Sequence, residues 1–335
     1  MPVVSDSAGS SPSILVTSRS FSSGDLDLRA ELEAAGAEVV IRAANHDLQE
    51  LRPSLACAFA WIAGASPITA AHLDAAPHLR LIARYGVGVD GVDLTAAASR
   101  GITVTNTPGA NTGAVADHTL GLILALLRQI TAGDRRVRRG DWQVQRTREL
   151  HELTIGILGA GRIGREVARR LAGFHSALIG YDPVVSDMDL RAAGIRPVSP
   201  AELASDSDLV SLHAPGERPI IDAAWLAGAR PGLLLVNTAR ASLVDETALA
   251  FALADGRIGG YAADTLTAEF DHARGSPLLD PRLADRTIFT PHSAAQTVAA
   301  VDNMGRAATD AVLALLQGRT PPNVVIAGNP AQRRR

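Results

Sequence analysis

Lysine is absent from the 335 residues of this sequence, so every residue of the combined lysine and arginine count is an arginine. Schiff-base enzymes, Walker-type nucleoside triphosphatases and the short-chain dehydrogenases with a Tyr-Lys pair all need a lysine side chain for their chemistry. The absence of lysine therefore excludes these three classes of protein.

Cysteine is almost absent as well, since Cys57 is the only one in the sequence. A single thiol excludes an intramolecular disulfide and a cysteine-rich metal cluster, and it fits a reducing compartment. We predict no metal site. Because a free cysteine most often packs as a small apolar residue, we expect Cys57 to be buried within the apolar segment 55–62.

An excess of one charge and long apolar runs are missing too. The net charge is −3 with acids and bases mixed, so we expect no nucleic-acid partner. The longest apolar run, 120–127, is much shorter than the ~20 residues of a membrane-spanning helix. The Ser-rich segment 1–12 lacks the regions of a signal peptide, and we expect a disordered tail there. These features predict a cytoplasmic protein without a membrane partner.

Alternating strand and helix patterns fill the chain, which is long enough for two domains. In the first part, strands are predicted at 13–16, 36–41, 56–62, 79–83 and 102–105, with helices at 26–35 and 70–75. In the second part, strands are predicted at 154–158, 177–181, 208–213, 233–237, 260–264 and 287–290, with helices at 188–193, 222–229 and 246–254. The remaining segments are a long apolar helix at 115–130, a basic turn at 135–141, a last helix at 294–316 and an extended segment at 321–326. This rhythm predicts an α/β fold with doubly wound parallel sheets.

The clearest motif spans residues 154–182, where a strand, three glycines, a helix, a strand and an acid follow one another. Gly159 permits a tight turn, Gly161 lets the backbone approach a pyrophosphate, and Gly164 lets the helix pack closely on the strand. The N–H groups at the helix start favour phosphates. Asp182 can accept hydrogen bonds from the adenosine ribose and would repel a 2′-phosphate. The motif favours an NAD site over a purely structural turn, and NAD over NADP.

Three polar residues, Arg240, Glu269 and His292, lie just after predicted strand ends, where ligands bind in such sheets. A histidine can exchange the proton of a substrate oxygen near neutral pH, and a carboxylate beside it would fix its orientation. A guanidinium can hold a substrate carboxylate in a fork. Taken singly, the three could instead be a helix cap, a surface charge and a partner of a backbone carbonyl. Together they favour hydride transfer at a carbonyl.

Six motifs give the sequence a resemblance to the NAD-dependent D-isomer-specific 2-hydroxyacid dehydrogenases over about residues 13–325. They are RYGVGVD at 84–90, NTPGAN at 106–111, VADHT at 115–119, LGAGRIG at 158–164, VNTAR at 236–240 and TPHSAA at 290–295. The resemblance implies two Rossmann-like domains, of which a flavodoxin-like substrate domain, 12–108 with 296–328, surrounds an inserted NAD-binding domain, 109–295. It also implies a homodimer through the helix region 115–130.

The same resemblance assigns roles to the candidate site residues. His292 would be the acid/base, Glu269 its partner and Arg240 the substrate anchor, with the backbone N–H groups near Val87 and Gly88 holding the substrate carboxylate. The residues expected to bind the cofactor, with Asp264 at the nicotinamide carboxamide, are Gly159, Gly161, Arg162, Ile163, Gly164, Asp182, His213, Ala214, Pro215, Thr238, Ala239, Asp264 and His292.

The sequence departs from the family pattern at three places. Ala241 stands where the family usually has Gly, and Phe270 stands where it usually has Pro. The segment 213–219 is shorter than usual and lacks the Thr that approaches the nicotinamide. These departures affect the expected cofactor contacts and leave the three catalytic candidates in place.

The resemblance implies hydride transfer between NAD and C2 of a small D-2-hydroxy acid or 2-oxo acid, and it leaves the acid open. Oxidation of 3-phosphoglycerate and reduction of glyoxylate or hydroxypyruvate both occur in the family. Phosphoglycerate enzymes place a phosphate-binding Arg near the position of Ala63, for which Arg19 or Arg84 could substitute.

Relatives with other chemistry are a further consideration. Phosphite dehydrogenases use a loop lysine, which this chain lacks, and formate dehydrogenases pair the histidine with Gln rather than with a residue like Glu269. The remaining alternative is an NAD-sensing corepressor-like protein that keeps the same three residues and binds other proteins with little catalysis.

Overall fold

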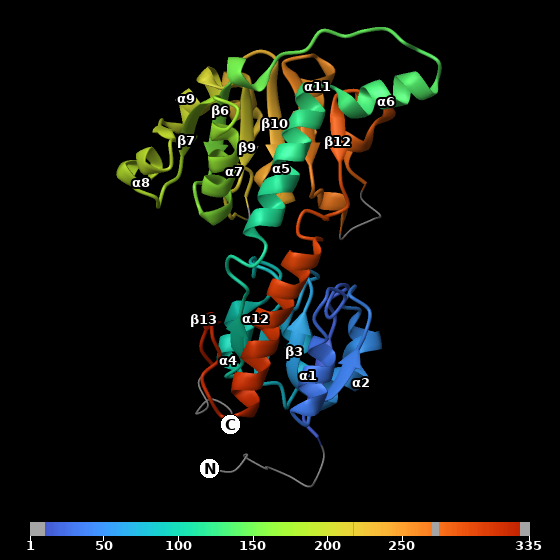
Figure 1. Cartoon of the computed structure of the whole chain (residues 1–335). Coiled ribbons are helices and arrows are strands. Elements are labelled where there is room, and N and C mark those ends of the chain that lie inside the picture. The colour runs from blue at the N-terminus through green and yellow to red at the C-terminus, as the bar shows by residue number, and fades with distance from the viewer. Residues whose placement is uncertain (1–10, 217, 270–274, 329–335) are drawn as a thin grey trace. The chain divides into compact units, whose positions relative to one another are not determined.

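The computed structural model describes residues 11–216, 218–269 and 275–328 and divides into two compact units (Figure 1). The first unit consists of Met1–Asn111 together with Gln296–Arg335, and the second is the continuous stretch Thr112–Ala295. The disordered tail expected at 1–12 lies almost wholly outside the described residues. None of the helices within the described ranges has the length and apolar content that crossing a bilayer requires.

The described part of the first unit contains a six-stranded sheet in the order β13-β5-β4-β3-β1-β2. Its strands are β1 Ser13–Val16, β2 Glu38–Ile41, β3 Ala58–Ala63, β4 Leu81–Arg84, β5 Thr103–Thr105 and β13 Val324–Ile326. All neighbours pair in parallel except β13, which is antiparallel to β5. The order 2-1-3-4-5 of the parallel strands is that of flavodoxin. The predicted flavodoxin-like α/β fold of this unit is therefore confirmed.

The helices of the first unit are α1 Leu28–Ala34, α2 Leu48–Cys57, α3 Ala70–Asp74, α4 Leu94–Ser99 and α12 Val298–Leu316. Helices α2, α3 and α4 share one apolar core with the sheet, around the fully buried Trp61. Helices α1 and α12 pack on each other, and Arg306 of α12 forms an ion pair of 2.7 Å with Glu31 of α1. The start of α12 differs from the predicted 294, because Thr297 caps the helix.

Two expectations about residues 55–62 are wrong. Helix α2 extends to Cys57, so the strand begins at Ala58 and not at residue 56. Leu51 and Leu55 form the buried face of α2. Because Cys57 lies two residues after Leu55, it points to the opposite side of the helix and is exposed rather than buried.

The described part of the second unit contains a seven-stranded sheet in the order β12-β11-β10-β9-β6-β7-β8. Its strands are β6 Thr154–Leu158, β7 Ala177–Tyr181, β8 Arg196–Pro197, β9 Leu209–Leu212, β10 Leu233–Asn237, β11 Ile258–Ala263 and β12 Thr287–Phe289. All pairs are parallel, as expected for a doubly wound sheet. The order reverses between β6 and β9, and ligands bind beyond the carboxyl ends of the strands at such a point.

Helices cover both faces of this sheet, and two apolar cores lie beneath them. They are α5 Thr112–Leu127, α6 Ile130–Arg138, α7 Arg162–Ala172, α8 Asp187–Ala192, α9 Pro200–Asp206, α10 Ala223–Gly228 and α11 Glu246–Ala254. Single turns of 3-10 helix lie at η1 Leu150–Glu152, η2 Ala241–Leu243, η3 Thr267–Glu269, η4 Pro277–Leu279 and η5 Pro281–Leu283. Helices α5 and α7 pack side by side on one face, whereas α9, α10 and α11 belong to the other core (Figure 1).

The end of the long apolar helix differs from the prediction. Helix α5 stops at Leu127, because Gln129 adopts a left-handed backbone conformation with φ of 52°, and α6 begins at Ile130. The basic turn expected at 135–141 is mostly helical, since α6 continues to Arg138. Residues 135–139 are four arginines and a valine, and arginine is a good helix former. The segment therefore stays helical until shortly before Gly140.

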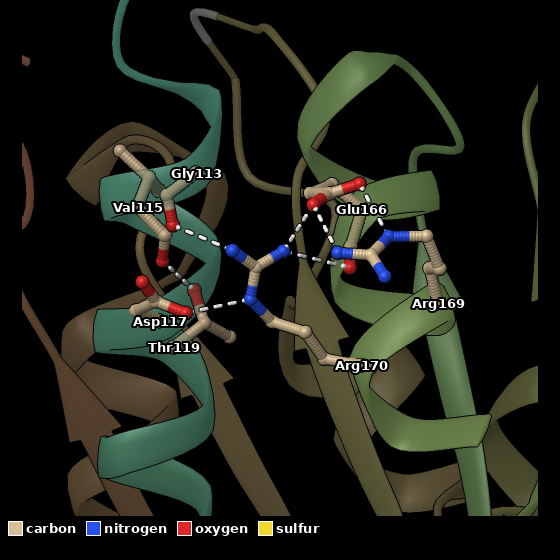
Figure 2. A network of polar contacts seen from close by, with 7 residues as sticks. All are labelled: Gly113, Val115, Asp117, Thr119, Glu166, Arg169 and Arg170. Atoms are coloured by element: carbon tan, nitrogen blue, oxygen red, sulfur yellow. Dashed lines mark hydrogen bonds and ion pairs between the residues drawn. The ribbon is translucent and has the colours of Figure 1, made fainter. Parts of the chain in front are cut away.

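A polar network joins the first two turns of α5 to α7 (Figure 2). Nε of Arg170 donates to Oδ1 of Asp117 at 2.6 Å, and its Nη2 donates to the carbonyl of Gly113 at 3.2 Å. The same guanidinium and that of Arg169 both bind the Glu166 carboxylate. These two arginines lower the pKa of Glu166 to about 2.

Glu166→Gln therefore tests a pH-dependent contribution to stability. Because the pKa of Glu166 is lower in the folded protein, its stabilisation is complete above about pH 4.5 and is lost as the pH falls toward about 2. Urea unfolding at neutral pH is expected to show the variant less stable by about 0.5–1 kcal/mol. The difference should shrink steadily between pH 4.5 and the acid limit of folding. A difference of constant size over that range would contradict the role of the charge.

Candidate active site

The glycine loop follows β6 directly and has the geometry that its three glycines require. Gly159 has φ of +91°, and a Cβ there would lie 2.5 Å from the backbone nitrogen of Ala214. A Cβ at Gly164 would lie 2.1 Å from the carbonyl oxygen of Gly159. Gly161 caps the N-terminus of α7, and a Cβ there would meet nothing within 4 Å. The backbone around Gly161 is thus open to a ligand, while Gly159 and Gly164 allow close packing.

Asp182 follows β7, and the structure brings its carboxylate to the glycine loop. Its Oδ2 accepts a hydrogen bond of 2.7 Å from the backbone N–H of Ala160, and its Oδ1 accepts from those of Val184 and Val185. The carboxylate thereby fixes the loop between Gly159 and Gly161. Its predicted contact with a ribose stays a prediction, for which each carboxylate oxygen retains acceptor capacity.

The segment after β9 lies beside the glycine loop. The backbone N–H of His213 donates to the carbonyl of Leu158 at 2.7 Å, and Ala214 packs against Gly159. Burial lowers the pKa of His213 to about 3, so its ring is neutral at physiological pH. Pro215 is exposed, as is Arg162 at the first position of α7, and Ile163 is partly buried.

The turn after β10 carries Arg240 and is organised by a buried amide. Oδ1 of Asn237 accepts from the backbone N–H of Ala239 at 2.9 Å, and its Nδ2 donates to the carbonyl of Arg240 at 2.8 Å. Thr238 hydrogen bonds through its hydroxyl to Thr119 of α5 at 2.8 Å. Arg240 is half-buried, and its Nη1 donates to the carbonyl of Ala239.

Ala241 and Phe270 are two of the departures from the family pattern. Ala241 begins the 3-10 helix η2, a right-handed conformation that does not require glycine. Phe270 lies outside the described residues.

Glu269 and His292 are in direct contact. Nδ1 of His292 lies 2.6 Å from Oε1 of Glu269, and both side chains are only partly exposed. A carboxylate can only accept, so the hydrogen of this bond resides on Nδ1. Nε2 of His292 then faces away from Glu269, and among the described residues it has no hydrogen-bond partner. This is the geometry of an imidazole whose orientation is set by an acid.

Asp264 holds the turn that carries His292. The residue is 2% exposed, and its Oδ1 accepts from the hydroxyl of Thr290 and from the backbone N–H of Ser293. Its Oδ2 accepts from the N–H of Ala294 at 2.8 Å, and its carbonyl accepts from the N–H of His292. His292 itself has φ of 51°, a conformation that non-glycine residues rarely adopt. Asp264 thus serves the turn; its predicted contact with a carboxamide stays untested.

His118 and Thr290 belong to this site, although the sequence reasoning gave neither of them a role. Nε2 of His118 lies 2.9 Å from the Thr290 hydroxyl and 3.5 Å from Oδ1 of Asp264. The sequence feature that could have identified His118 is the VADHT motif at 115–119, which lies on α5. Within the described residues, no cluster of three or more potential metal ligands occurs.

Val87 and Gly88 lie in the first unit, in the loop after β4. The carbonyl of Val87 accepts a hydrogen bond of 2.8 Å from the Asn106 side chain, and the N–H of Thr107 donates to Gly86. These bonds join the loops of the RYGVGVD and NTPGAN motifs. Val87 is 37% exposed and Gly88 is partly buried.

Two alanine substitutions test separately whether the glycine loop binds a ligand and whether it needs glycine for packing. Gly161→Ala meets open space in the free protein, so its melting temperature should change little, while NADH binding should weaken at least about tenfold. Gly164→Ala forces α7 away from Gly159 and should destabilise the fold by about 1–3 kcal/mol. Thermal unfolding and NADH fluorescence titration measure the two effects.

Gly133→Ala in α6 is the matched control, since its Cβ also meets nothing within 4 Å. This variant should leave NADH affinity unchanged and should not lower the melting temperature. Normal NADH affinity in Gly161→Ala would contradict the placement of a pyrophosphate at this loop.

Comparison with known proteins gives the context of this site. Residues 120–294 match the NAD-binding domain described as that of the D-isomer specific 2-hydroxyacid dehydrogenases. The chain is 38% identical over 272 residues to the D-3-phosphoglycerate dehydrogenase of Mycobacterium tuberculosis H37Rv, covering 80% of this chain and 51% of that protein. It is 35% identical over 269 residues to the glyoxylate reductase of Korarchaeum cryptofilum, covering 77% and 80%. The chain therefore spans about half the length of the phosphoglycerate dehydrogenase and most of the glyoxylate reductase.

A solved structure shows the same architecture. The D-lactate dehydrogenase of Aquifex aeolicus, complexed with NAD and lactic acid, superimposes with a TM-score of 0.83 at 27% identity. The match covers 94% of this chain and all of that one. The two-unit α/β organisation is thus shared over nearly the whole chain.

Proposed function

Since this chain belongs to the D-isomer specific 2-hydroxyacid dehydrogenase family, we propose that it transfers a hydride between NAD and C2 of a small D-2-hydroxy acid or 2-oxo acid. The observation that carries the proposal is the 2.6 Å contact between His292 and Glu269 at the carboxyl edge of the second unit's sheet. Arg240 follows β10 at this edge, and the glycine loop follows β6. Parallel strands bring all these ends to one side.

The residues of the glycine loop fit NAD. A Cβ at Gly161 would occupy the open space beside the N-terminus of α7, where N–H groups favour a pyrophosphate. Asp182 adds a negative charge at the ribose end, which favours NAD over NADP. When bound, the nicotinamide accepts or supplies the hydride, and the remaining steps belong to the protein.

His292 exchanges the proton of the reacting oxygen. In the direction of reduction, the protonated imidazole donates from Nε2, because Nδ1 is engaged by Glu269. The carboxylate of Glu269 keeps the ring in this orientation and stabilises its positive charge before the transfer. In the direction of oxidation the same nitrogen takes the proton from the substrate hydroxyl.

Arg240 and the loop after β4 bind the substrate. The guanidinium of Arg240 can form a fork with a carboxylate. The backbone N–H groups of Val87 and Gly88 can hold an anion. Under this proposal, 12–108 with 296–328 is the substrate-binding domain and 109–295 is the NAD-binding domain.

Two substrate classes remain open within the proposal. Ala63 ends β3, is fully buried and carries no charge to receive a phosphate. Arg84 lies close to it, with Nη1 3.5 Å from the Ala63 carbonyl. Glyoxylate or hydroxypyruvate needs no phosphate site, whereas 3-phosphoglycerate would depend on Arg84 or Arg19. We find no feature of the described residues that favours the alternative of a protein-binding corepressor.

The proposal includes a cytoplasmic homodimer. Support for self-association comes from the apolar side chains of Ile130, Val137, Trp142 and Val144, which are 43–93% exposed on α6 and the segment after it. Ile130 ends the helix region 115–130, which we propose as part of the interface, and the other three residues follow it. The single thiol fits the cytoplasm.

His292→Ala tests the proton transfer. Turnover in the oxidation of NADH by glyoxylate, hydroxypyruvate, pyruvate or 3-phosphohydroxypyruvate should fall by about 10²–10⁴-fold, because an acid/base contributes that much. NADH should still bind. The measurements are the decrease of NADH absorbance and a binding titration.

His151→Ala is the matched control, because His151 also lies beside a glutamate, Glu149, but is exposed and outside the site. Its turnover should equal that of the wild type. Near-normal turnover of His292→Ala would refute the assignment. Binding of NADH without turnover of any of the four acids would refute the proposed reaction.

A further inference from the structure

Glu246 is a buried carboxylate that the proposed reaction does not use. It is the first residue of α11, and only 7% of its surface is exposed. Within the described ranges, no arginine or histidine pairs with it. A buried charge without a cation is costly unless hydrogen bonds satisfy its oxygens.

The donors to Glu246 come from residues on either side of Glu269 in the chain. Oε1 accepts from the backbone N–H of Thr267 at 2.8 Å, and Oε2 accepts from the Thr267 hydroxyl at 2.7 Å. Oε2 also accepts from the hydroxyl of Ser276 at 2.6 Å. The carboxylate therefore ties both flanks of the Glu269 segment to the N-terminus of α11, where the helix dipole also favours a negative charge.

Thr267 begins the single turn η3, of which Glu269 is the last residue. One turn of 3-10 helix has little stability of its own, so its position depends on contacts outside it. The 2.6 Å bond between Glu269 and His292 is sensitive to displacements well below 1 Å. A group that fixes the start of η3 therefore controls this bond.

We propose that Glu246 is a positioning residue whose buried carboxylate holds η3 and so keeps Glu269 in hydrogen-bond contact with His292. The role rests on the proposed function, in which Glu269 orients His292. An apolar residue at this place would avoid the cost of a buried charge. It would leave the hydroxyls and the N–H of the Glu269 segment without their acceptor.

The test compares Glu246→Leu with Glu269→Gln and with the double variant, using NADH and the best of the 2-oxo acids. Glu246→Leu should lower kcat by about 10–100-fold, as a misplacement of a catalytic group does, and leave NADH affinity unchanged. In the Glu269→Gln background, the same substitution should lower kcat by less than about twofold, because residues that act as a unit are not additive. Both single variants should shift the pH profile of kcat/KM in the same direction.

Two further variants guard against a purely structural effect. Asp245→Ala removes the N-cap of α11, whose donors are Thr247 and Ala248, and costs about 1 kcal/mol of stability without touching η3. Its kcat should remain that of the wild type. Glu246→Gln keeps the shape and an acceptor and should restore kcat to within about threefold.

A readout without turnover separates this inference from the proposed function. In ¹⁵N-histidine-labelled protein, the Nδ1–H proton of His292 bonded to Glu269 should give a downfield signal that moves upfield in Glu269→Gln, whose neutral amide oxygen is a weaker acceptor, and that is lost in Glu246→Leu. It should persist in Asp245→Ala. If Glu246→Leu does not fold, Thr267→Val with Ser276→Ala removes the two hydroxyl donors and takes its place. Equal losses of kcat in both Glu269 backgrounds, or an unchanged Nδ1–H signal, would overturn the inference.

Discussion

The carboxylate of Asp264 is the constraint on which the site depends. Buried at the end of β11, it accepts hydrogen bonds from the Thr290 hydroxyl and from the N–H groups of Ser293 and Ala294. These bonds bend the chain after β12 so tightly that His292 takes a positive φ. Strain of this kind persists only where the surroundings enforce it. Two features thus set the orientation of the imidazole: the backbone turn around Asp264 and the side chain of Glu269.

Acids secure the other loops of this edge in the same way. Asp182 accepts a hydrogen bond from the backbone N–H of Ala160 in the glycine loop, and Glu246 accepts one from that of Thr267 at the start of η3. A carboxylate offers several acceptor sites at one point and no donor, so it can gather the N–H groups that a sharp turn leaves unpaired. The loops at the carboxyl ends of β6 and β11 are therefore ordered by charge-assisted hydrogen bonds, whereas the strands below them are ordered by apolar packing.

The parts that sequence reasoning predicted are those that rest on local patterns. The parallel sheets and the turn at Gly159 follow from periodicity and glycine sterics. The pairing of Glu269 with His292 is expected from the family resemblance, whose motifs are themselves local. Helix α2 and the exposure of Cys57 did not follow, because Pro53 and polar residues obscure the helical period there. Nor did the contacts of Glu246 and His118, because hydrogen bonds between residues far apart in sequence leave no trace in a local pattern.

The second unit is one uninterrupted stretch of chain, and the hydrogen bonds described above for His292, Glu269 and Asp182 join residues within it. Residues of the first unit can change without breaking any of these bonds. Under the proposed function, substitutions in the loops of the first unit can alter the choice of substrate while these bonds in the second unit stay intact, so divergence in specificity need not begin with a loss of catalysis.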